Sequence, residues 1–85
     1  MHELSVANEV CRIAEERLGT AGSRRLRVLA LTVGDEAGLE PSNLHFCLEA
    51  LLGQPPFGAA RPLVTLLPGD ELRIEYLEVE DGRAP

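Results

Sequence analysis

The 85-residue sequence predicts an α+β domain in which two helices pack on one face of a small sheet of two or three strands. Two stretches carry apolar residues at three- and four-residue spacing, which is typical of helices, and three others are apolar or alternating, which is typical of strands. In chain order they run helix, strand, helix, strand, strand. A chain of this size has room for one modest core, so we expect residues 1–85 to form a single domain with an antiparallel or mixed sheet.

The first helix is predicted from Glu3 to about Leu18. Charged residues fill one face of this segment, as expected of a helix that is half exposed to water. Gly19 or Gly22 is expected to end the helix, because glycine readily adopts the left-handed conformation found at helix C-termini. The opposite, apolar stripe consists of Val6, Ala7, Val10, Cys11, Ile13, Ala14 and Leu18.

The first strand is predicted over residues 24–34 (RRLRVLALTVG). After Arg27 both alternating sets of side chains are apolar, so this strand is expected to be central and covered on both faces. The segment 34–38 (GDEAG) then interrupts the strand with turn residues and a glycine at each end.

The second helix is predicted to open at Glu40. Pro41 is suited to a first helical turn, and Ser42 or Asn43 is expected to cap the free backbone amides. The helix is expected to stop at Gly53. Its apolar stripe consists of Leu44, Leu48, Leu51 and Leu52.

The connector 54–58 (QPPFG) is predicted to be a loop, because its prolines cannot continue a helix or sit inside a sheet. Residues 62–67 then form a short strand candidate, and a turn leads into a last strand over residues 71–79. In that last run the apolar residues change parity, so a β-bulge near residues 76–77 is expected to return both sets to one face. These apolar residues are Leu72, Ile74 and Tyr76, followed by Leu77 and Val79.

The composition argues against several classes of protein. The formal net charge is -6 and all eight basic residues are arginine, so the basic face expected of a nucleic-acid-binding protein is missing. No run of about 18 apolar residues occurs, and the first residues carry no basic segment followed by an apolar run, which predicts a cytoplasmic protein without a membrane span. The two cysteines, Cys11 and Cys47, form no CxxC pair and are interpreted as reduced thiols on helices.

The start of the chain carries the candidate metal site. Met1, His2 and Glu3 place an α-amine, backbone amides and an imidazole in one short segment, and such nitrogen donors suit a late first-row metal ion. The second histidine, His45, is interpreted as a surface or half-buried residue. No serine has a histidine and an acid placed around it, and no lysine follows the glycines at 34–38, so no catalytic residues are predicted and the chain is not expected to be an enzyme.

Three stretches together resemble the HypA/HybF family of hydrogenase nickel-incorporation proteins: MHELSVANEV, LALTVGDEAGLEPSNLHFCLEALL and GDELRIEYLEVEDG. The resemblance covers roughly residues 1–52 and 69–82. Its most specific part is the start Met-His-Glu, followed by a strand, the pattern Gly-x-x-x-Gly-x-x-Pro and a helix. In that family the N-terminal segment binds nickel(II), and members are reported to work with a nickel-binding GTPase and the hydrogenase large subunit.

The resemblance implies nickel(II) as the bound metal. The Met1 amine, the His2 backbone nitrogen and imidazole, and the Glu3 backbone nitrogen are then the expected donors of a planar site. Amide nitrogens bind only after losing their protons, so the affinity is expected to rise with pH. Copper(II) generally binds such donors more tightly, so this segment alone does not select nickel.

The family also has a zinc-binding domain with two CxxC motifs inserted ahead of its last strand. Between Gly53 and Gly69 this chain has 15 residues and no cysteine, whereas a structural zinc site needs about four cysteine or histidine ligands. We therefore expect a nickel-binding domain without the zinc module and without bound zinc.

Two alternatives remain open from the sequence. The chain is either a metal-delivering accessory protein or an interaction module that docks on a hydrogenase subunit or a maturation partner without delivering metal. It is also a candidate homo-oligomer, either by pairing at an exposed sheet edge or by exchange of segments about Pro55 and Pro56.

Overall fold

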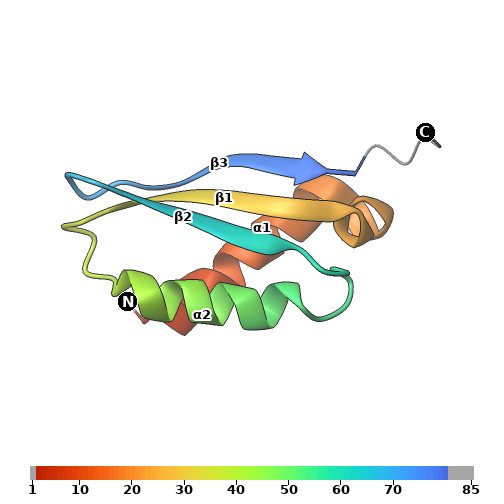
Figure 1. The fold of residues 1–85 in the computed structure, drawn as a ribbon, viewed down its shortest axis with the longest axis horizontal. Helices are drawn as coiled ribbons and strands as arrows, with labels where there is room; N and C mark the ends of the chain where they lie inside the picture. The colour runs from red at the N-terminus through yellow and green to blue at the C-terminus, as the bar shows by residue number, and fades with distance from the viewer. Residues whose placement is uncertain (1, 81–85) are drawn as a thin grey trace.

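The computed structural model describes residues 2–80, so Met1 and the end of the GDELRIEYLEVEDG stretch lie outside it. The described chain has the predicted α+β fold and the predicted order of elements (Figure 1). These elements are α1 (Glu3–Arg24), β1 (Leu26–Gly34), α2 (Pro41–Leu52), β2 (Arg61–Leu67) and β3 (Leu72–Val79).

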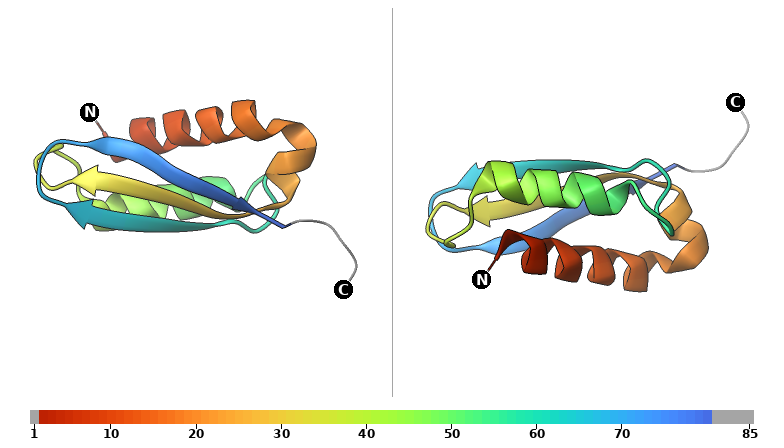
Figure 2. Two further views of the ribbon diagram at one scale, coloured as in Figure 1. Left: turned by 90° about the horizontal axis from the view of Figure 1, so that it is seen from above. Right: turned by 90° about the horizontal axis from the view of Figure 1, so that it is seen from below.

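The three strands form a mixed sheet in the order β2-β1-β3. β1 is parallel to β2 and antiparallel to β3, which confirms the central position predicted for it. Figure 2 shows both helices on one face of this sheet, while the other face has no helix on it. The parallel pairing requires a crossover between β1 and β2, and α2 supplies it.

The core lies between the sheet and the two helices. β1 contributes the side chains that alternate toward the helices, and the apolar stripes predicted for α1 and α2 meet them there. Within residues 2–80, none of the helices is long and apolar enough to cross a membrane. The central members of the buried cluster are Val6, Ala7, Val10 and Ala14 of α1, Leu29, Leu31 and Val33 of β1, and Leu44, Leu48 and Leu52 of α2.

The end of α1 differs in part from the prediction. Gly19 interrupts the helix with φ 68° and ψ -179°, a conformation that side chains with a Cβ rarely adopt. The chain then resumes as helix to Arg24, and the backbone amide of Arg25 donates to the carbonyl of Gly22 at 3.0 Å. The expected glycine break is therefore confirmed, but the helix extends beyond it.

The start of α2 corrects the predicted cap. The Glu40 carboxylate, rather than Ser42 or Asn43, accepts the free amides, at 3.2 Å from the Ser42 nitrogen and 2.7 Å from the Asn43 nitrogen. A carboxylate suits this position because the amino-terminal end of a helix carries partial positive charge. Pro41 occupies the first turn, as predicted.

The β-bulge expected in the last strand is present and lies close to the predicted position. Tyr76 opposes Ala30 of β1, and Ile74 opposes the next residue of β1, so Glu75 is left without a partner in the ladder. Ile74 and Leu77 thereby share the face that packs on the core. Tyr76 faces the other way and is half exposed, so its predicted grouping with Ile74 is wrong.

Gly34 is required where the end of β1 meets the turn that connects β2 to β3. A Cβ at this position would overlap the carbonyl oxygen of Gly69 and lie 2.7 Å from the backbone nitrogen of Asp70. We expect Gly34→Ala to lower the free energy of unfolding by about 1–3 kcal/mol, the usual cost of overpacking. Denaturant unfolding measures this change.

Gly53→Ala is the matched control, because its Cβ would lie 3.5 Å from the carbonyl oxygen of Glu49, an ordinary contact. Equal losses of stability in the two variants would contradict the close-approach explanation for Gly34.

Candidate functional site

The amino-terminal segment lies beside the start of α2 (Figure 1). His2 is the N-cap residue of α1, with an extended backbone at φ -83° and ψ 149°, and its side chain makes no capping hydrogen bond. The residue is exposed to solvent. Met1, the expected first ligand, lies outside the described residues. The imidazole of His2 is therefore accessible to an ion from solution.

The backbone nitrogens of this segment are not used by the helix. The first hydrogen bond of α1 runs from the amide of Val6 to the carbonyl of His2 at 3.1 Å. Amides ahead of the first such donor have no acceptor within the helix. A metal ion that replaced the amide protons of His2 and Glu3 would therefore break no hydrogen bond of α1.

The carboxylate of Glu3 accepts two hydrogen bonds from the start of α2. One oxygen accepts from the backbone amide of Glu40 at 3.1 Å, and the other accepts from the side-chain amide of Asn43 at 2.8 Å. We call Glu3, Glu40 and Asn43 the Glu3 clamp. It ties the first turn of α1 to the first turn of α2 and fixes the backbone next to His2.

The Glu3 clamp also keeps the Glu3 carboxyl group in its charged form. The hydrogen bond from the Glu40 amide, followed by that from the Asn43 side chain, holds the pKa of Glu3 below its usual range. Glu3 is therefore ionised at neutral pH and places a negative charge near any cation bound at His2. Sequence reasoning selected Glu3 for its backbone nitrogen and missed the role of its side chain, because the partners lie 37 and 40 residues away.

The other candidate ligands do not gather at this site. His45 is half buried beside a small open cavity of about 290 Å³ between α2 and β2. Within residues 2–80, no three histidine, cysteine or acidic side chains are grouped so as to hold a metal ion. Burial raises the pKa of the Cys11 thiol to about 11, which keeps it protonated at neutral pH and makes it a poor metal ligand.

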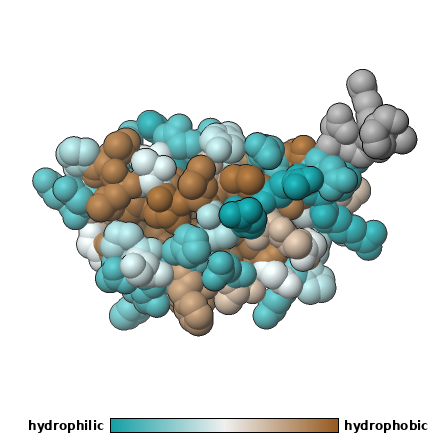
Figure 3. Space-filling view, in the orientation of Figure 1, coloured by the Kyte–Doolittle hydropathy of each residue, from teal (hydrophilic) through white to brown (hydrophobic). Residues whose placement is uncertain are grey.

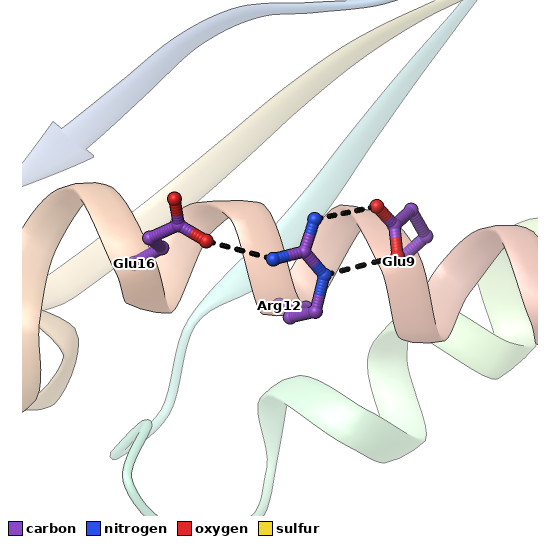
Figure 4. A network of polar contacts seen from close by, with 3 residues as sticks. All are labelled: Glu9, Arg12 and Glu16. Atoms are coloured by element: carbon purple, nitrogen blue, oxygen red, sulfur yellow. Dashed lines mark hydrogen bonds and ion pairs between the residues drawn. The ribbon is translucent and has the colours of Figure 1, made fainter.

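The charged face of α1 is a surface network, as predicted. Figure 4 shows Arg12 between Glu9 and Glu16. Its guanidinium donates to Glu9 at 2.6 and 3.0 Å and to Glu16 at 2.7 Å. All three side chains are exposed to water, so these pairs orient one another and contribute little to stability.

Comparison with known proteins points to one family. The family model described as hydrogenase/urease nickel incorporation, metallochaperone, HypA matches residues 1–63. The matched range begins at the first residue of the chain and includes α1, β1, α2 and the start of β2.

Two curated relatives illustrate the extent of the similarity. The hydrogenase maturation factor HypA of Geobacter metallireducens is 35% identical over 69 residues, which cover 81% of this chain and 60% of that protein. The hydrogenase maturation factor HypA of Geotalea uraniireducens is 28% identical over 113 residues, covering 94% of this chain and all of that protein. The second alignment is longer than the chain itself, so part of that relative faces a gap.

A solved structure has the same fold. The solution structure of the Ni metallochaperone HypA from Helicobacter pylori superposes with a TM-score of 0.75 over 93% of this chain and 97% of that one. The two sequences are 14% identical, so this likeness concerns the fold alone.

Substitution of Asn43 tests the Glu3 clamp. We expect Asn43→Ala to raise the pKa of Glu3 toward its ordinary value of 4.5, because one donor to the carboxylate is lost. Nuclear magnetic resonance titration of the Glu3 carboxyl carbon measures this shift. Because the pKa is lowered in the folded chain, the contribution of Glu3 to stability is present above pH 4.5 and is lost as the pH falls through the lower folded value.

Ser42→Ala is the control, since Ser42 donates to the Glu40 carboxylate through its backbone only. An unchanged pKa of Glu3 in Asn43→Ala would show that the side-chain contact is not maintained in solution.

Proposed function

The chain belongs to the HypA family of hydrogenase and urease nickel-incorporation proteins, and we propose that it binds nickel(II) at its amino terminus and delivers it during maturation of a nickel-iron hydrogenase. The family match over residues 1–63, which includes the Met-His-Glu start, carries this proposal. The chain acts in the cytoplasm and hands on the metal by docking rather than by catalysing a reaction.

Four nitrogens form the proposed nickel site: the Met1 amine, the His2 backbone nitrogen and imidazole, and the Glu3 backbone nitrogen. Adjacent chelate rings hold such donors in one plane, the arrangement that nickel(II) favours with strong nitrogen ligands. Two observations support the assignment. The amides ahead of Val6 are free of helical hydrogen bonds, and the Glu3 clamp holds the segment against α2.

Residues 1–85 act as a single nickel-binding domain without a zinc module. The proposal rests on the cysteine content, because Cys11 and Cys47 are the two cysteines of the sequence and no CxxC pair is present. The proposed partners are a nickel-binding GTPase, which supplies or receives the metal, and the hydrogenase large subunit, which is its destination.

A second candidate function is a docking module that binds a hydrogenase subunit or a maturation partner without delivering nickel. The segment between Gly53 and Gly69 favours it, since this part of the sequence lacks the cysteines of the family's zinc domain.

Nickel titration of protein that begins with a free Met1 tests the first function. We expect a visible d–d band of planar nickel that grows with added metal, and an affinity that rises with pH as the amides lose their protons. His2→Ala removes the imidazole, so the band should be lost and the affinity should fall by roughly tenfold or more, a factor equivalent to 1.4 kcal/mol.

His45→Ala should leave both quantities unchanged. A band that persists in His2→Ala, or none in the unaltered protein, rules out the proposed ligand set. An added residue before Met1 should act like His2→Ala, because it removes the free amine.

Capture of partners separates the two functions. If the chain delivers nickel, His2→Ala should lower hydrogenase activity in cells while the chain still recovers its partner in a pull-down. If it is a docking module alone, His2→Ala should change neither the recovered partner nor the hydrogenase activity.

A further inference from the structure

β2 is an edge strand with an exposed apolar surface. In the order β2-β1-β3 it pairs on one side with β1, and its other side is free within the described sheet. Three of its leucines are exposed: Leu63 by 49%, Leu66 by 50% and Leu67 by 42%. Figure 3, in the orientation of Figure 1, shows hydrophobic side chains gathered on the side of the molecule along which β2 runs. Soluble proteins usually protect such an edge, because it invites pairing with another strand.

Edge strands are usually protected by charged side chains, and β2 has few of them. Between Glu49 and Asp70 the sequence has a single charged residue, Arg61, although the whole chain has a net charge of -6. The opposite edge strand, β3, has charges along its length and is flanked by α1 (Figure 2). Two copies that meet at β2 therefore avoid the repulsion that their net charge would cause elsewhere.

The sequence of β2 is self-complementary about Thr65. We propose that two copies of this chain pair antiparallel along residues 63–67, with a two-fold axis through Thr65. Leu63 then opposes Leu67 of the second copy, and Val64 opposes Leu66. Each pair lies on one face of the sheet, because its members are equally far from Thr65. The two Thr65 side chains meet at the axis, a favourable cross-strand pair.

The face of β2 that is turned toward α2 also favours a second copy of the chain as the partner. Val64 and Leu66 line the open cavity beside α2, together with Pro41, Ser42 and His45. The second copy would place its own Leu66 opposite Val64, at this cavity. The exposed half of Leu66 would thereby be covered in both copies at once, as in an isologous interface.

The pairing is expected to be reversible. Five paired residues per copy bury less than the roughly 1,200–2,000 Å² of a standard stable interface. Of the two routes to a homo-oligomer expected from the sequence, this is strand pairing; exchange about Pro55 and Pro56 is not needed, because each copy keeps its own elements.

The dimer does not depend on the proposed nickel site. Antiparallel copies lie edge to edge in one continuous sheet, so the two amino-terminal segments, each beside the start of its own α2, lie toward opposite ends of the strands (Figure 1). A dimer without nickel binding, or nickel binding without a dimer, therefore distinguishes the two proposals.

Sedimentation of the full chain over a wide range of concentration tests the pairing. We expect the mass to rise from that of one chain, 9.2 kDa, toward twice that value, and to fall again on dilution. The mass of one chain at every concentration would overturn the proposal.

Thr65→Lys is the sharpest variant, because it places two like charges directly opposite each other at the axis. Thr65 is exposed, so the fold tolerates the change. We expect the dissociation constant of the dimer to rise about tenfold or more, since like charges in contact oppose association. Thr20→Lys, at an exposed position of α1, adds the same charge away from β2 and should leave the dimer unchanged.

A mixture of Thr65→Lys and Thr65→Glu distinguishes pairing from a general loss of folding. Each variant alone should be largely monomeric, whereas the mixture should recover the dimer through opposite charges at the axis. Failure of the mixture to associate more strongly than either variant would overturn the proposal, as would an unchanged dimer in Thr65→Lys. Nickel titration of Thr65→Lys should match that of the unaltered protein.

Discussion

The rest of the described fold depends on the burial of β1. Within residues 2–80 it is the one strand with two neighbours, and its side chains form a single buried cluster with those of both helices. Its parallel partner brings α2 across the inner face, and its antiparallel partner closes the sheet next to α1. The position of each surface element, the amino-terminal segment included, follows from these contacts.

Local patterns in the sequence were enough to predict the elements. The apolar residues on both faces of β1 indicated its central place: Leu29 on the helix face and Ala30 on the face without a helix are both buried, although helices cover one face only. The change of parity between Ile74 and Leu77 indicated a bulge, since an extra residue returns both to the core. The parallel pairing of β2 had no such signal, because it depends on how α2 crosses the sheet.

The sequence proposes the ligands of the candidate site but does not reveal the contacts that hold the segment in place. Met1, His2 and Glu3 are adjacent in sequence, so the proposed chelate rings do not depend on the fold, although Met1 lies outside the described residues. The contacts of the Glu3 carboxylate with Glu40 and Asn43 join segments about forty residues apart. No spacing rule connects such positions. The cap on α2 was misassigned for a different, local reason, because a glutamate is an uncommon N-cap residue.

The place of β1 between two later strands also has a consequence for folding. Both of its neighbours follow it in the chain, and Leu72–Val79 comes last of the described elements. A nascent chain that has emerged only as far as α2 therefore exposes β1 with neither edge paired, in a state open to association with other chains. The sheet is completed only once both β2 and β3 have been synthesised, so the native state forms late in synthesis or after it.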